Sequence, residues 1–227
     1  TWGSNLYGQL GDGGLPTRNY PFQIGTATDW LQVAAGQYHS YALKTTKKLW
    51  AWGRNHVGQL GDNTTVLKIN PVAISPSLSF DYITGGPNTG AAIDTAGALY
   101  TWGVGITINS HFPYQLTTFT TGFTNVKLGT GHTIATRNVA GTNYFYTWGQ
   151  NSFGELGNVA TTLATPTLNT LVSNPTSKIA VNFYSSQILD TNGQLHSSGQ
   201  NHVGQLAIGN NTGVNLYVYG FSIRNCP

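Results

Sequence analysis

Residues 52–61 read WGRNHVGQLG, and versions of this glycine-rich box return along the chain at intervals of about fifty residues. A Trp-Gly pair stands at Trp2, Trp52, Trp102 and Trp148, and Ser198-Gly199 takes its place in the last copy. Further boxes read SNLYGQLGDG from Ser4, QNSFGELGNV from Gln150 and QNHVGQLAIG from Gln200, whereas the third unit carries VGITINSHFP from Val104. A sequence period of this length indicates a solenoid or a propeller.

Each period also contains four short β-like runs and no segment with the apolar periodicity of a helix. Prolines open the first run, at Pro21, Pro71, Pro113 and Pro166. The second run ends at Gly36, Gly86, Gly129 and Asn182. Because Asn replaces Gly where the backbone needs a positive φ, we expect a left-handed turn at this position. Hairpin turns such as 94–97 and 190–193 join the third run to the fourth.

Four-stranded units at this spacing predict an all-β fold, a β-propeller of four-stranded antiparallel blades, because each sheet needs the next one to cover its face. We expect about four complete blades plus partial ones at both ends. They form a single propeller domain or segment, 1–227, with repeat units at about 1–50, 51–100, 101–146, 147–196 and a partial unit at 197–227. Complete strand sets are expected at about 21–53, 71–103, 113–149 and 166–199, with an orphan last strand at Trp2 and an orphan first strand around Leu216–Ile223.

The chain is poor in charge, with 7% charged residues against about 25% in a typical soluble protein. No apolar stretch is long enough for a transmembrane helix, so we expect no membrane insertion. The net charge of +3 does not indicate a nucleic-acid partner, because the one basic cluster is an expected solvated hairpin tip formed by Lys44, Lys47 and Lys48. A chain that begins at Thr1 and contains no Met is expected to be a fragment of a longer one.

The repeats resemble the regulator-of-chromosome-condensation repeat family, whose units read roughly W-G-x-N-x-x-G-Q-L-G, then Pro, then G-x-x-H-[ST]-x-A-L and a hairpin. The first motif is matched in full at 52–61 and from Trp2, and the second by Gly36, His39, Ser40, Ala42 and Leu43. Departures that mark a divergent member are the missing third box and three replacements: Thr89 and Ser185 for His, and Ser198 for Trp. The resemblance implies a propeller that recognises proteins through loops on one face and is no metabolic enzyme.

Four histidines could suggest a metal or catalytic site, but each has a structural interpretation. His39 and His132 share a repeat position with a hydroxyl residue in the other units. This pattern predicts a small buried polar group that satisfies backbone within or between blades. His56 and His202 stand in the box, where the other copies carry Leu or Ser, which favours an exposed loop tip.

The few acidic residues do not form a recognisable active site. Glu155 takes the box position held elsewhere by Gln, and Asp94 and Asp190 are expected in turns. No pair of carboxylates is placed for glycoside hydrolysis, and no nucleophile elbow or phosphate-binding loop occurs. We therefore predict that the chain is not an enzyme and has no catalytic residue, no metal site, no cofactor and no small-molecule substrate. Its binding residues are not identified from sequence.

Tryptophans and N-glycosylation sequons are candidate ligand and modification sites. All six Trp fall at repeat positions, so core packing is expected rather than light sensing or sugar stacking. Two Asn-x-Thr sequons, at Asn63 and Asn210, lie in loops after the box and are expected to be exposed. The sequence leaves open whether either is glycosylated.

These observations favour a non-enzymatic scaffold for protein–protein interaction, with a protein partner or a homo-oligomeric assembly. A surface rich in Thr, Asn, Ser and Gly and nearly without charge is unlike a cytosolic solubility strategy. It favours a structural or adhesive component displayed outside the cell or on a virion. Two alternatives are a guanine-nucleotide exchange or other regulatory propeller, and a secreted protein inhibitor of a hydrolase.

Overall fold

A computed structural model describes residues 1–105, 109–173 and 175–222, and the regular elements in that part of the chain are all β-strands. None of the described segments is a helix long and apolar enough to cross a membrane. The strands form four antiparallel sheets of four strands each. Two compact units divide the chain, the first containing β1–β8 and the second β9–β16.

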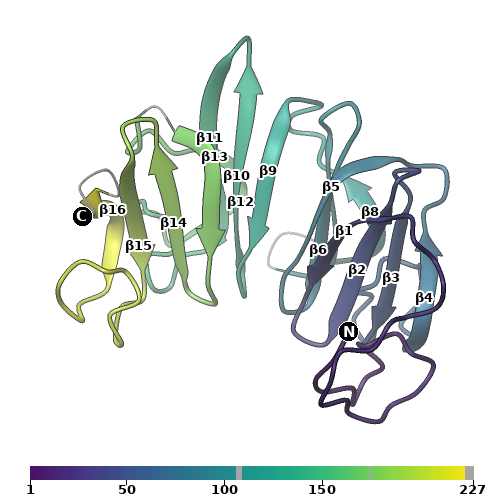
Figure 1. The fold of residues 1–227 in the computed structure, drawn as a ribbon. Coiled ribbons are helices and arrows are strands. Elements are labelled where there is room, and N and C mark those ends of the chain that lie inside the picture. The colour runs from purple at the N-terminus through teal and green to yellow at the C-terminus, as the bar shows by residue number, and fades with distance from the viewer. Residues whose placement is uncertain (106–108, 174, 223–227) are drawn as a thin grey trace. The chain divides into compact units, whose positions relative to one another are not determined.

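Strand order follows chain order in every sheet (Figure 1). The first sheet contains β1 (Trp30–Ala35), β2 (His39–Lys44), β3 (Leu49–Gly53) and β4 (Lys68–Ile74). The second contains β5 (Phe80–Gly85), β6 (Thr89–Asp94), β7 (Leu99–Val104) and β8 (Asn109–Gln115). The third contains β9 (Phe123–Leu128), β10 (His132–Val139), β11 (Thr142–Gln150) and β12 (Thr162–Leu168). The fourth contains β13 (Pro175–Val181), β14 (Ser185–Asp190), β15 (Gln194–Gly199) and β16 (Val214–Ser222). The predicted fold class, a β-propeller of four-stranded antiparallel blades, is confirmed.

The proline-led runs close the preceding sheet instead of opening the next one. In the first sheet β4 pairs with β3, with Ala51 opposite Val72. The glycine box between these strands is therefore a long return loop within one blade. Pro71, Pro113 and Pro166 lie in β4, β8 and β12, which are edge strands, where the missing N–H of proline is tolerated. The strand sets expected at 21–53, 71–103, 113–149 and 166–199 thus begin one strand too early.

In the part of the chain that the structure describes, neither of the two expected orphan strands is found as an unpaired strand of a partial blade. The run around Leu216–Ile223 belongs to β16, which pairs with β15 and completes the fourth sheet, although Ile223 itself lies outside the described residues. At the other end the strand expected at Trp2 is reduced to a single bridge between Gly3 and Arg18. The run after Pro21 is not a strand. The repeat boundaries, which concern sequence units rather than sheets, stay a prediction.

Steric fit, rather than a left-handed backbone, requires glycine at the end of the first strand of a sheet. The expected positive φ at this position is wrong, because Gly36, Gly129 and Asn182 all lie outside the positive-φ region. A Cβ added to Gly36 would lie 2.0 Å from Cε1 of His39, and one on Gly129 would lie 2.1 Å from Cε1 of His132. At Asn182, where a Cβ is present, the residue three positions later is a serine rather than a histidine.

Each unit buries a core between its two sheets. In the first unit, Tyr41, Leu43 and Leu49 of the first sheet pack with residues of the second, namely Phe80, Ile83, Tyr100 and Trp102. In the second unit, Ile134 and Phe145 pack with Ile179, Ile188 and Tyr217. Packing one sheet face on the next is the arrangement that propeller blades require.

Candidate interaction surface on the glycine-box loops

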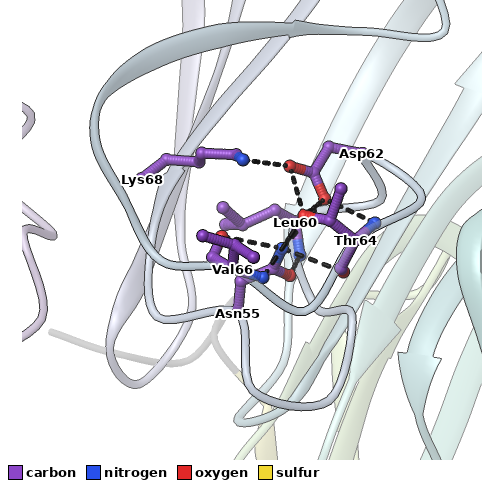
Figure 2. A network of polar contacts seen from close by, with 6 residues as sticks. All are labelled: Asn55, Leu60, Asp62, Thr64, Val66 and Lys68. Carbon is purple, nitrogen blue, oxygen red and sulfur yellow. Dashed lines mark hydrogen bonds and ion pairs between the residues drawn. The ribbon is translucent and has the colours of Figure 1, made fainter.

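One buried asparagine holds each glycine-box loop in shape. Oδ1 of Asn55 accepts the Leu60 N–H at 3.0 Å, and its Nδ2 donates to Asp62 Oδ1 at 2.8 Å and to the Thr64 carbonyl at 3.0 Å (Figure 2). The side-chain oxygen of the matching asparagine accepts the equivalent N–H in the other boxes, at 2.9 Å, 2.8 Å and 2.9 Å for Asn5, Asn151 and Asn201. Because these asparagines are at most 8% exposed, each loop is fixed from inside and its polar centre is occupied.

An acid at the end of the first two boxes ties the loop to the outer part of the blade. Asp62 pairs with Lys68 at 3.2 Å (Figure 2), and Asp12 pairs with Arg18. Burial alone would raise the pKa of Asp62, but hydrogen bonds from Thr64 and Asn55 outweigh it and hold the pKa below its ordinary value. Both carboxylates are already neutralised by cations of this chain, which argues against a metal or catalytic role at this point.

Glu155 is a buried acid at a position that otherwise holds glutamine. Gln9, Gln59 and Gln205 each accept the backbone N–H two residues earlier, and Glu155 accepts the Phe153 N–H at 2.7 Å in the same way. The Glu155 side chain is almost fully buried, and burial raises the pKa of its carboxyl. Within the described part of the chain it forms no ion pair.

Glu155→Gln is expected to raise the free energy of unfolding at pH 7 by about 1 kcal/mol or more, because it removes a buried charge and keeps the acceptor. Because the pKa is raised in the folded state, the cost of the carboxyl grows as the pH rises from the ordinary value of 4.5 to the folded pKa and is complete above it, so the gain should disappear near pH 4. Urea unfolding followed by circular dichroism at both pH values measures it. The reverse change at an equivalent box, Gln205→Glu, should destabilise at pH 7. A Glu155→Gln variant less stable than the parent at pH 7 would contradict this account.

The other predicted turn acids also have structural roles. The Asp94 carboxylate accepts the N–H groups of Ala96 and Ala98 at 2.9 and 2.8 Å, which confirms its place in a hairpin turn. Asp190 caps the equivalent turn by accepting the Gln194 N–H at 2.9 Å, and it also lies 3.2 Å from Nε2 of buried His196. Neither carboxylate faces a second carboxylate.

Exposed side chains cover the tips of the boxes. His56 and His202 are exposed, as predicted. Apolar residues at the box tips are also unusually open, with Leu6 of the first box 69% and Val203 of the last box 72% exposed. Phe153 is 42% exposed at the tip of the third box. Apolar side chains held on rigid loops, where they pay little entropy on binding, are suited to protein recognition.

The tip of the first box also belongs to an aromatic and cationic cluster. The rings of Tyr7 and Tyr38 lie 5.0 Å apart, and the Arg54 guanidinium carbon lies 4.7 Å from the Tyr7 centroid and 5.4 Å from that of Tyr38. Tyr38 also accepts the Arg54 backbone N–H at 2.9 Å through its carbonyl. The second unit repeats this arrangement without charge: Phe153 and Tyr184 lie 4.9 Å apart, and Gln200 takes the place of the arginine.

Family models of the regulator of chromosome condensation (RCC1) repeat match residues 1–43 and 30–59, which include the first two boxes and the Gly36–Leu43 motif. Residues 1–59 of this chain therefore carry RCC1 repeats, and the chain is similar to a divergent member of the RCC1-repeat family. A search of curated proteins gives no significant match.

Solved structures support the RCC1-type fold. Human WBSCR16 is 20% identical with a TM-score of 0.79, and the alignment covers 96% of this chain and 61% of that one. This chain therefore spans less than two thirds of the human protein. Prp20p from Saccharomyces cerevisiae is 19% identical with a TM-score of 0.61, covering 100% of this chain and 74% of that one. Yeast RCC1 (Prp20) bound to Kap60 is 18% identical with a TM-score of 0.60, covering 100% and 72%. At these identities the likeness concerns the fold.

His39 and His132 of this RCC1-repeat chain are buried, as predicted, at 1% and 2% exposure. Burial lowers the pKa of each imidazole to about 4, and the backbone of the next sheet, at Thr89 and Ser185, opposes part of the shift. The predicted backbone hydrogen bonds are not formed with standard geometry within the described residues. Tight packing against Gly36 and Gly129 holds the rings instead.

The prediction that all six tryptophans pack in the core holds for Trp52, Trp102 and Trp148 only. Two of these buried indoles pack on a glycine of the preceding box: Trp52 on Gly11 and Trp102 on Gly61. Trp2 is 65% exposed, and no box stands before it in the 227 residues. The partly exposed Trp30 and Trp50 line a cavity of about 380 Å³ on the first sheet, together with Phe22 and Lys44.

The three lysines of the basic hairpin tip, expected to be solvated, all interact with other groups of the first unit. Lys44 pairs with Asp29 at 3.0 Å, Lys47 pairs with Asp81 at 2.8 Å, and Lys48 donates to the Leu78 carbonyl at 2.9 Å. Two of the three charges are therefore balanced by acids of the same unit, which leaves little for a phosphate backbone.

Sequence reasoning did not single out Tyr7, Tyr38 or Arg54, which come from three separate loops. A signal for the ring pair is present in the repeats, because the positions of Tyr7 and Tyr38 are both aromatic again at Phe153 and Tyr184. The sequons Asn63 and Asn210 are exposed in loops, as expected.

Proposed function

We propose that this chain is a non-enzymatic scaffold that binds a protein partner through the exposed tips of its glycine-box loops. One observation carries the proposal: buried asparagines hydrogen-bond the box loops from inside, while apolar side chains such as Leu6 and Val203 are exposed at the loop tips. A rigid loop that presents apolar side chains loses little conformational entropy on binding. The acidic residues of the boxes already form ion pairs or accept backbone hydrogen bonds within their loops, so they do not form an arrangement that points to catalysis.

Capture of a partner, followed by tip variants, tests the proposal. The immobilised chain is mixed with extract from its source, and captured proteins are identified and then titrated in purified form. Leu6→Ser and Phe153→Ser should weaken binding, whereas Val33→Ser, which removes a 74% exposed valine from β1 rather than from a box, should not. Equal effects of tip and control variants on a purified partner would overturn the assignment of the surface.

A regulatory role is a second candidate, favoured by the yeast structures. Prp20p has binding properties to Gsp1p and histones, and yeast RCC1 (Prp20) forms a complex with Kap60. Release of a fluorescent guanine nucleotide from a purified Ran-like GTPase tests this role: acceleration by the chain supports nucleotide exchange, and an unchanged rate argues against it. Display outside the cell or on a virion remains part of the proposal, supported by the charge-poor composition. Immunolocalisation of the native protein tests it, and a purely free cytosolic pool would exclude it.

A further inference from the structure

The Arg54 guanidinium is held in place without being neutralised. It lies over the rings of Tyr7 and Tyr38, at 4.7 and 5.4 Å, and its own backbone N–H is fixed to the Tyr38 carbonyl. Within the described residues the guanidinium forms no ion pair. Stacking uses the flat faces of the guanidinium and leaves its N–H donors, which lie in the plane, available for a partner.

Every acidic side chain of the protein is engaged elsewhere. Four aspartates pair with Arg or Lys, and a fifth lies beside a buried histidine: the pairs are Asp12–Arg18, Asp29–Lys44, Asp62–Lys68, Asp81–Lys47 and Asp190–His196. Asp94 caps its own turn, and Glu155 is buried in the third box. The chain has only these seven acids, all described. None of the acidic side chains in these 227 residues is therefore left for Arg54, and a carboxylate for it would come from outside them.

We propose that Tyr7, Tyr38 and Arg54 form an anchor for an aspartate or glutamate side chain of an acidic segment in a protein partner. This inference rests on the proposed function and names the chemistry of the partner at one point of the surface. The planar donors of arginine match the two oxygens of a carboxylate, and the pre-stacked side chain loses little entropy when it binds. Exposed Leu6 beside Tyr7 provides apolar contact next to the charge. Arginine and tyrosine in one cluster are typical of binding hot spots.

The proposed anchor is tested by selection from a random peptide library on the immobilised chain, in parallel with Arg54→Gln, Arg54→Lys and Arg18→Gln. Glutamine is the natural residue at the equivalent Gln150 and Gln200, so Arg54→Gln should fold normally. Arg18 is the matched control, because it also lies over a ring, 4.0 Å from the Phe22 centroid, but is neutralised by Asp12. Peptides selected by the parent chain and by Arg18→Gln should be enriched in Asp and Glu. Those selected by Arg54→Gln should not be, and Arg54→Lys should retain only part of the enrichment.

A double-mutant cycle on the tightest selected peptide then assigns the contact. Replacing its acidic residue by the amide, or Arg54 by Gln, should each weaken binding about tenfold or more, and the two changes together should weaken it no further. Equal acidic enrichment on Arg54→Gln, or additive losses in the cycle, would overturn the anchor. If peptides still bind in a Leu6-dependent way in that case, the proposed function stands. A parent chain that selects no peptide would contradict both.

Discussion

Trp102→Ala is expected to lower the free energy of unfolding by about 3–5 kcal/mol, the range of large aromatic truncations in protein cores. The indole is 1% exposed, and its N–H donates to the Gln59 carbonyl at 3.0 Å and to the Tyr41 hydroxyl at 3.1 Å. The ring fills the space above Gly61 and Gly90, where added Cβ atoms would lie 3.0 and 2.3 Å from it. Truncation therefore leaves a cavity in the contact between two blades, and it removes one of the two hydrogen bonds to the Gln59 carbonyl, which the Tyr41 hydroxyl still donates to. Urea unfolding followed by far-ultraviolet circular dichroism measures the loss.

Trp2→Ala is the matched control, because Trp2 holds the same repeat position but is 65% exposed. Its effect should stay below about 0.5 kcal/mol. Trp102→Phe keeps a ring and loses the N–H, so it should fall between the two. Similar losses at Trp2 and Trp102 would show that the repeat position itself, rather than packing on a box, determines the stability contribution.

The fourth sheet shows how the same contact is made without tryptophan. Ser198 stands at this position, is fully buried and donates its hydroxyl to the Gly154 carbonyl of the preceding box. A hydrogen bond to a box carbonyl is thus kept while the ring is lost, although the acceptor is the box glycine rather than the following residue, to which Trp52 and Trp102 donate. From sequence, Ser198 is simply a departure from the repeat, because the motif records residue type and not the bond that it makes.

The fifty-residue period predicted the number of four-stranded sheets but not which strands share one. A Pro-led run can follow the box as the last strand of one blade or precede the next blade as its first strand, and both arrangements preserve the period. Ala51 pairs with Val72, which shows that the Pro-led run is the last strand of the blade that precedes it in the chain. The short connection from Ile74 to Phe80 is therefore the crossover between sheets, although the box is the longer and more conspicuous loop.

The candidate site was predictable where a motif maps to one loop and not where loops meet. The glycine boxes and their exposed His56 and His202 tips follow from local sequence. The Arg54 anchor does not, because its rings come from residues 47 and 16 positions away in the chain and only the folded blade brings them together. The positive φ predicted for Gly36 was wrong for a similar reason. Glycine is required there by the His39 ring, and backbone propensities do not record a contact with another side chain.

Acidification from pH 7 to pH 4.5 is expected to destabilise the protein by roughly 2–3 kcal/mol for each of His39 and His132. Burial lowers the pKa of both to about 4, whereas the unfolded chain has the ordinary value near 6.5. The unfolded state therefore binds more protons throughout this window, and stability is complete above about pH 6.5 and falls as the pH is lowered towards the folded pKa. Hydrogen bonds hold the pKa of Asp12, Asp62 and Asp190 below ordinary values, so these acids stay ionised and contribute little to the slope.

His39→Thr and His132→Ser separate this effect from packing, because they introduce the residues that other sheets carry at the same position. Each variant loses contacts at every pH, since its smaller side chain leaves space beside Gly36 or Gly129. The difference in unfolding free energy between pH 7 and pH 4.5 should nevertheless shrink by about half in each single variant and largely vanish in the double variant. Glu155 acts in the opposite direction, because its raised pKa makes acid favourable, so the steepest loss is expected in Glu155→Gln. A parent slope that survives in the double histidine variant would place acid sensitivity in other groups.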